Sequence, residues 1–205
     1  MMILVGQFDS PFVRRVAATM THYGLPFDSH QLSVFGDSDE VRRLNPLGRV
    51  PALILDEGET LVDSSIIIDY LDELAPPEKL LTPRSGPMRR AVLRTATIAM
   101  GMSERAVQLR TEVVRRPAHL QSPEFIASYE DAIRQSIDLL QREAVSPWIL
   151  GDGPTQADFA VTAALTHLTN RVEAYADLSA WPVLSAIRDK GEALEPFKSN
   201  PFPVS

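Results

Sequence analysis

Three short motifs in the first third of the chain combine residues that can bind an anion. They are Ser-Pro-Phe at positions 10–12, Val50-Pro51 and Asp63-Ser64. The first and third motifs are typical of helix starts, where backbone N–H groups lack partners within the helix and attract negative charge. An X-Pro bond in the cis form would expose a backbone edge beside them. The pattern therefore indicates a binding site for a small, acidic, peptide-like molecule.

Each motif lies at a junction between predicted elements of secondary structure. Apolar runs and alternation predict strands at residues 2–5, 27–32, 50–55 and 60–62. Helical spacing of apolar residues predicts helices from Ser10 to about residue 24 and over 64–74, with a charged helical turn at 39–44. The predicted order is therefore β-α-β-(α)-β-β-α, which is an α/β arrangement.

The rest of the chain predicts an all-helical half. Residues 75–87 contain four prolines and one glycine, which is typical of a linker. Helical patterns follow over 89–115, 123–144, 157–168 and 182–194, without a convincing strand. The Thr-Gln-Ala-Asp motif at 155–158 predicts a capping box at the start of a buried helix. We therefore predict two domains, residues 1–76 and 88–205, joined by a linker at 77–87.

Composition limits the classes of function. With 205 residues and 44% hydrophobic content, the chain can bury a substantial core. It has no cysteine, which excludes disulfides and a protein thiolate, and its four histidines lack the spacing of metal ligands. A net charge of −7 argues against nucleic acid or a membrane surface as a partner. We expect no metal, no membrane span and a cytoplasmic location.

The ordered set of motifs resembles the glutathione transferase family. It comprises residues 10–15, 45–51 and 63–64 in the first half and 155–158 in the second. The resemblance covers almost the whole chain and is nearest to bacterial members with serine at the first position. It implies a thioredoxin-like N-terminal domain followed by an all-helical C-terminal domain, with glutathione as co-substrate.

Under this resemblance, Ser10 is the expected catalytic residue. Its hydroxyl would donate a hydrogen bond to the glutathione sulfur, and the helix start behind it would favour the thiolate. The same serine can also act only as a helix N-cap, with Pro11 in the first turn. Both interpretations are compatible with the sequence.

The resemblance also implies the residues that bind glutathione. The Val50–Pro51 bond is expected to be cis, so that the backbone of Val50 pairs with the cysteinyl group. Ser64 is expected to hold the γ-glutamyl carboxylate, with Asp63 nearer the ammonium group, and Arg49 either pairs with the glycine carboxylate or is a solvated surface residue. The expected glutathione-binding set is Phe12, Arg49, Val50, Pro51, Asp63 and Ser64.

The electrophile would bind in a pocket between the two halves, with Met102 and Arg105 as candidate lining residues. The adjacent basic residues Arg14 and Arg15 are expected on a solvated helix face.

These observations predict a cytoplasmic glutathione transferase that conjugates glutathione to an apolar small molecule, and the resemblance implies that it is a homodimer. Two alternatives remain open at this level. One is a non-catalytic adaptor that binds RNA polymerase, as the stringent starvation protein does with this fold. The other is a specialised glutathione-dependent isomerase or lyase, because fold does not fix function.

Overall fold

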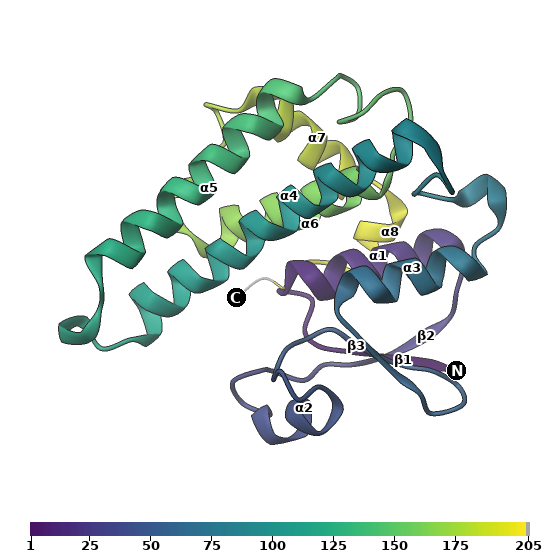
Figure 1. The fold of residues 1–205 in the computed structure, drawn as a ribbon, viewed down its shortest axis with the longest axis horizontal. Helices are drawn as coiled ribbons and strands as arrows, with labels where there is room; N and C mark the ends of the chain where they lie inside the picture. Colours follow the sequence, from purple (N-terminus) through teal and green to yellow (C-terminus); the bar gives the residue numbers. More distant parts are fainter. Residues whose placement is uncertain (204–205) are drawn as a thin grey trace. The chain divides into compact units, whose positions relative to one another are not determined.

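The computed structural model describes residues 1–203, which form two compact units (Figure 1). The first unit comprises residues 1–82 and the described part of the tail that starts at Glu192. The second unit comprises residues 83–191. The expected combination of a thioredoxin-like α/β half with an all-helical half is confirmed. The tail joins the first unit, whereas the sequence patterns place the whole C-terminal half in one domain.

A mixed four-stranded sheet forms the centre of the first unit. Its strands are β1 (Met2–Val5), β2 (Phe27–His30), β3 (Ala52–Ile54) and β4 (Thr60–Val62). The order across the sheet is β2-β1-β3-β4, with β1 parallel to β2 and antiparallel to β3, and β3 antiparallel to β4. The hairpin of β3 and β4 is therefore added to the edge of a parallel βαβ unit.

Helices cover both faces of this sheet, because successive strand residues point to opposite sides. Val5 and Ala52 form an apolar cluster with Val41 of α2 (Ser38–Leu44) on one face. Leu4 and Leu53, which alternate with them, are fully buried. α1 (Pro11–Tyr23) and α3 (Ser64–Leu74) lie side by side over that opposite face (Figure 1).

The C-terminal tail adds a short helix that the sequence patterns did not predict. After α7 (Pro182–Glu192) the chain forms α8 (Glu195–Lys198), which packs against α1. A four-residue helix is too short to produce a periodic apolar pattern, and Pro196 in its first turn made the segment resemble a proline-rich coil. The short 3₁₀ turn η1 (Pro77–Lys79) follows α3 in this unit.

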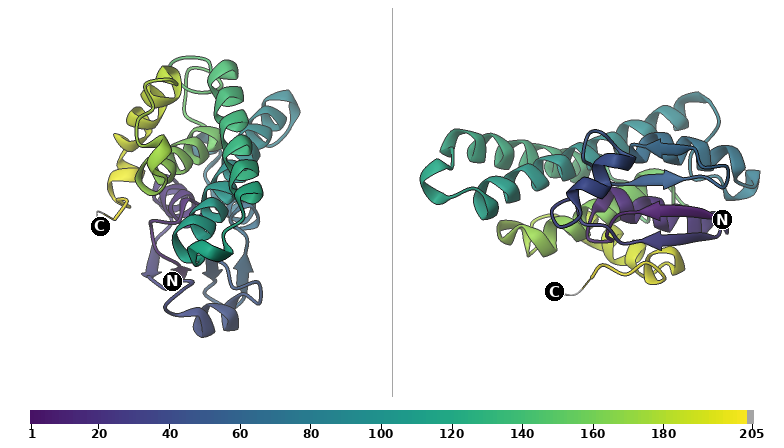
Figure 2. Two further views of the ribbon diagram at one scale, coloured as in Figure 1. Left: turned by 90° about the vertical axis from the view of Figure 1, so that its left-hand side faces the viewer. Right: turned by 90° about the horizontal axis from the view of Figure 1, so that it is seen from below.

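The second unit is built of helices packed around a buried one. Its long helices are α4 (Gly86–Arg110), α5 (Pro123–Glu143) and α6 (Gln156–Arg171), and most of α7 also belongs to it. The short helical segments are the π-helical turn η2 (Thr111–Arg115) and the 3₁₀ turns η3 (Ala118–Leu120) and η4 (Glu173–Tyr175). All residues of α6 from Gln156 to Leu168 are buried, as expected from their apolar and small side chains. α4 packs against both α5 and α6, and Figure 2 shows α4 and α5 side by side.

The start of α6 has the predicted capping box. Thr155 is the N-cap, and the carboxylate of Asp158 accepts hydrogen bonds from the backbone and hydroxyl of Thr155 at 2.8 and 2.9 Å. Its other oxygen accepts a hydrogen bond from the backbone of Ile149 at 2.7 Å. Burial raises the pKa of Asp158, and these hydrogen bonds oppose the rise. This carboxylate therefore joins the loop before α6 to the helix.

Among residues 1–203, no helix combines the length and apolar character needed to cross a membrane.

Candidate functional site

The register of the sheet brings the three N-terminal motifs to one edge. Val5 of β1 pairs with Ala52 of β3, and Ala52 pairs with Val62 of β4. Because β1 runs antiparallel to β3 and β3 antiparallel to β4, the segments that follow Val5, precede Ala52 and follow Val62 leave the sheet at the same end. Ser10, Pro51 and Ser64 lie in or next to these three segments.

Ser10 is positioned by the turn from β1 into α1. It is the N-cap of α1 in an extended backbone conformation, and Pro11 occupies the first helical turn. Its Oγ accepts a hydrogen bond from the backbone N–H of Val13, at a long donor–acceptor distance of 3.4 Å. The side chains of Ser10 and Phe12 are half-buried. A hydroxyl that accepts one weak bond keeps its own proton to donate to a ligand.

Gly6 sets how closely the three segments approach, a role that the sequence patterns did not reveal. Its φ is +127°, and a Cβ there would lie 2.6 Å from Cγ2 of Val13 and 2.8 Å from Cβ of Val50. Any larger residue would push the start of α1 away from the segment before β3. The signal was a glycine directly after a buried strand, which is a position where a close backbone approach is common.

The segment before β3 is ordered by Asn45. This buried side chain donates a hydrogen bond to the carbonyl of Arg49 at 2.9 Å and accepts one from the backbone of Leu47 at 3.0 Å. The Val50–Pro51 peptide bond that follows is cis, which confirms that expectation. The side chain of Arg49 is exposed.

The start of α3 presents two hydroxyls and a capping carboxylate. Asp63 is the N-cap, with a φ of 69°, and its exposed carboxylate accepts a hydrogen bond from the N–H of Ser65 at 2.8 Å. Ser64 begins the helix and is only 3% exposed. The first N–H groups of a helix have no partners within it, so this end of α3 offers donors to an anion.

The adjacent arginines of α1 are buried, so the expectation of a solvated helix face was wrong. Arg15 is 3% exposed, and its Nη2 donates hydrogen bonds to Oγ of Ser64 at 2.8 Å and Oγ of Ser65 at 3.1 Å. Burial lowers its pKa to about 10, and the negative charge of Asp63 partly opposes that decrease. This arginine links α1 to the start of α3, and it is a site residue that sequence reasoning missed.

Arg14 has a different role from Arg15. It is 1% exposed, and its Nη2 donates to Oε2 of Glu192 at 2.7 Å while its Nε donates to the carbonyl of Asn200 at 2.9 Å. The guanidinium also lies 5.0 Å from the ring centre of Phe197. Arg14 therefore holds the C-terminal tail against α1.

Comparisons with known proteins agree with this architecture. Residues 4–79 match the family model "Glutathione S-transferase, N-terminal domain", and residues 123–190 match "Glutathione S-transferase, C-terminal domain". The chain is 30% identical over 171 residues to the Escherichia coli protein named "Uncharacterized GST-like protein YibF", with 83% of each chain covered.

The chain belongs to the glutathione S-transferase family.

Two further relatives of this glutathione S-transferase connect the fold to named proteins. "Maleylacetoacetate isomerase" of Pseudomonas aeruginosa is 30% identical over 193 residues, covering 90% of this chain and 88% of the relative. A crystal structure of a glutathione transferase family member from Pseudomonas fluorescens, with bound glutathione, is 28% identical, has a TM-score of 0.90 and covers 100% of both chains. The protein is thus an enzyme of the glutathione transferase kind.

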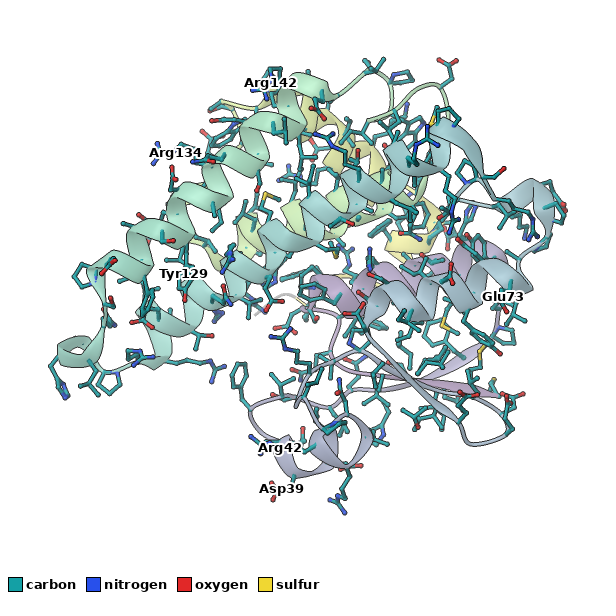
Figure 3. The ribbon with its side chains drawn as sticks, in the orientation of Figure 1. Asp39, Arg42, Glu73, Tyr129, Arg134 and Arg142 are labelled. Atoms are coloured by element: carbon teal, nitrogen blue, oxygen red, sulfur yellow. The ribbon has the colours of Figure 1, made fainter. Side chains whose placement is uncertain are left out.

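The two expected electrophile-pocket residues, Met102 and Arg105, both lie on α4. Met102 of α4 is 1% exposed. Arg105 is exposed, donates to Oε1 of Gln108 at 2.7 Å and lies 5.9 Å from the ring centre of Tyr129 on α5. It lines a groove of about 710 Å³ between α4 and α5, and Arg142 lines the same groove. Figure 3 labels Arg142 near the end of α5.

No group of three or more His, Asp or Glu side chains within the described residues 1–203 could hold a metal ion.

Proposed function

We propose that this glutathione S-transferase binds glutathione at the edge of the sheet where α1 and α3 begin, and that Ser10 stabilises its thiolate. The observation that carries the proposal is the register of the sheet, which directs three segments to one end. Two of them open helices with an N-cap serine or aspartate, and the third contains the cis Val50–Pro51 bond.

The proposed chemistry begins with the thiol of glutathione. A free thiol has a pKa of about 8.5, and a helix start nearby lowers it. The hydroxyl of Ser10 donates a hydrogen bond to the sulfur anion, and the N-terminus of α1 adds a favourable field. The thiol proton leaves to solvent. The thiolate then forms a bond to an electrophilic carbon, and a leaving group departs with its electron pair or a double bond takes up the charge.

The remaining groups at this edge suit the parts of the tripeptide. Ser64, at the start of α3, offers its hydroxyl and N–H to the γ-glutamyl carboxylate. The backbone of Val50 pairs with the cysteinyl group as a short added strand, and Phe12 contributes apolar surface. Arg49 pairs with the glycine carboxylate. The Pseudomonas fluorescens family member with bound glutathione supports this assignment.

The oligomeric state and the cellular location are proposed from the family to which the chain belongs. We propose a cytoplasmic homodimer in which α4 contributes to the contact between copies. Exposed apolar side chains of α4, Met88 and Leu93, support that part of the proposal.

A glutathione-dependent isomerase is a second candidate function. It is favoured by the Pseudomonas aeruginosa relative named "Maleylacetoacetate isomerase" and by the two arginines in the groove between α4 and α5, since cations suit an acidic substrate. In such a reaction the thiolate adds to a cis carbon–carbon double bond, the resulting single bond rotates, and elimination of the thiolate leaves the trans isomer. Glutathione is then regenerated rather than consumed.

The binding step is tested by calorimetric titration of the protein with glutathione, alongside the Ser64→Ala variant. We expect binding in the micromolar to millimolar range, weakened about ten-fold in the variant because a charge-assisted hydrogen bond is lost. A folded wild-type protein that does not bind glutathione would overturn the proposal.

The two reactions are separated by the fate of glutathione. A chloronitrobenzene electrophile and a maleyl diacid are each incubated with enzyme and a limiting amount of glutathione. A transferase consumes one glutathione per product and stops when it is exhausted. An isomerase converts many equivalents of the cis diacid for each glutathione present, and this outcome would move the second candidate to the front.

A further inference from the structure

Arg15 of α1 is a buried cation whose guanidinium contacts the start of α3, where the glutathione carboxylate is expected to bind. Its Nη2 donates to the hydroxyls of Ser64 and Ser65, at 2.8 and 3.1 Å. Its Nε is buried and has no hydrogen-bond partner. Only 3% of Arg15 is exposed. A buried N–H without a hydrogen-bond partner costs folding free energy unless a ligand or a nearby charge compensates it.

Within residues 1–203, the positive charge of Arg15 has no direct counter-ion. Among the described residues, no carboxylate forms an ion pair with it, and the acid whose charge acts on its pKa is Asp63. That carboxylate is exposed and accepts the N–H of Ser65. The neighbouring Arg14 differs, because the carboxylate of Glu192 binds it through both oxygens. Of the two buried arginines, only Arg15 leaves its charge available to a ligand.

The hydrogen bonds of Arg15 also decide how the two serines can act. A serine hydroxyl has one proton to donate, whereas a guanidinium only donates. Because Ser64 and Ser65 accept from Arg15, their own protons point to other acceptors. Together with the N–H groups at the start of α3, they form a set of donors around a positive charge. Such a set suits a carboxylate and disfavours a neutral amide, which brings hydrogen-bond donors of its own.

We propose that Arg15 is a positioning and specificity residue, which holds the hydroxyls of Ser64 and Ser65 as donors and makes the start of α3 selective for a carboxylate. The inference rests on the proposed function, in which this group is the α-carboxylate of the γ-glutamyl residue. It adds to that function the residue that sets the charge preference of the site.

The test compares two ligands by calorimetric titration. One is glutathione, and the other is its analogue with a carboxamide in place of the γ-glutamyl α-carboxylate. We expect the wild-type protein to bind glutathione at least about 30-fold more tightly than the amide. Arg15→Gln should lower that ratio about ten-fold or more, and Arg15→Lys, which keeps the charge, should retain most of it.

Arg14→Gln is the matched control, since it removes the other buried arginine of the same helix without touching the start of α3. Its ligand ratio should equal that of the wild-type protein. A purely structural role for Arg15 predicts that both Gln variants weaken the two ligands equally, which would leave the ratio unchanged and overturn the inference.

A third variant decides the question if Arg15→Gln does not fold. Ser65 is exposed, so Ser65→Ala should fold, and we expect it to lower the ratio about three-fold because one hydroxyl held by Arg15 is lost. An unchanged ratio in this variant would contradict the inference. If the wild-type protein binds neither ligand, the proposed function fails and the inference fails with it. If it binds glutathione but the variants keep the wild-type ratio, only the inference fails.

Discussion

The two units begin helices with the same local chemistry and use it differently. α1 starts with Ser10-Pro11 and α5 with Ser122-Pro123, and in both the serine Oγ accepts a backbone N–H at 3.4 Å. As helix caps, the two serines are nearly identical. What differs is their surroundings, because only Ser10 lies at the sheet edge where three chain segments meet. The proposed binding site is therefore distinguished from a simple helix cap by the strand register and not by the cap itself.

The acidic residues at the starts of α3 and α6 show the same contrast. Both oxygens of Asp158 accept hydrogen bonds from its own chain, and its side chain is 1% exposed. Asp63 is exposed and caps one N–H, while the hydroxyl of Ser64 faces a buried arginine. Hydrogen bonds within the chain occupy the start of α6, whereas the start of α3 has the donors that the proposed glutathione site requires.

The largest expected effect on the free energy of unfolding comes from removing the hydrogen bonds that Asp158 accepts at the start of α6. Asp158→Ala removes three hydrogen bonds and leaves the N–H of Ile149 buried without its acceptor, so we expect a loss of about 3 kcal/mol in the free energy of unfolding. Asp63→Ala, the matched change at α3, removes one exposed cap and should cost only about 1 kcal/mol. Urea unfolding of both variants measures the difference, and equal losses would contradict the contrast.

A smaller effect separates Ser10 from its counterpart in α5. Ser10→Ala and Ser122→Ala should each lower the free energy of unfolding by about 0.5–1 kcal/mol, because each removes one long cap bond. Only Ser10→Ala should raise the pKa of the bound glutathione thiol, by about one unit or 1.4 kcal/mol. The ultraviolet absorbance of the thiolate across pH measures this pKa in each complex. If Ser10→Ala leaves it unchanged, the serine is a cap and nothing more.

Most of the fold could be predicted from the sequence because its helices and strands depend on residues that are close together in the chain. The buried strand β1, the amphipathic α3 and the capping box of α6 each follow from residues next to one another in the chain. The three motifs also predicted one binding site, although the sheet edge that brings them together follows only from the strand register, and the cis Val50–Pro51 bond was anticipated through the family resemblance.

The arginines of α1 show where such reasoning stops. Two consecutive basic residues are usually solvated, yet the partners that bury these lie far along the chain. Glu192 is 178 residues from Arg14, and Ser64 is 49 residues from Arg15. No periodic pattern in the sequence predicts contacts over such separations. The positive charge of Arg15 at the start of α3 can therefore be recognised only in the packed structure of α1 and α3.

The smallest expected effect concerns the pH dependence of the start of α6. Burial raises the pKa of Asp158 in the folded protein, and the hydrogen bonds from Ile149 and Thr155 only oppose that rise. The folded state therefore keeps a proton at pH values where the unfolded chain has lost it, and stability falls as pH rises from the unfolded pKa through the folded one. Asp158→Asn does not titrate at this position.

The difference in unfolding free energy, wild type minus Asp158→Asn, should therefore decrease as pH increases from about 4 and level off once the pH exceeds the raised pKa of Asp158 in the folded state. Urea unfolding of both proteins at several pH values in this range measures it. A difference that grows with pH would mean that the three hydrogen bonds outweigh burial and that the folded pKa lies below its ordinary value. The start of α6 would then stabilise a carboxylate, as we propose for the start of α3. The two helix starts would differ only in the source of the anion, which is a side chain of the protein at α6 and a ligand at α3.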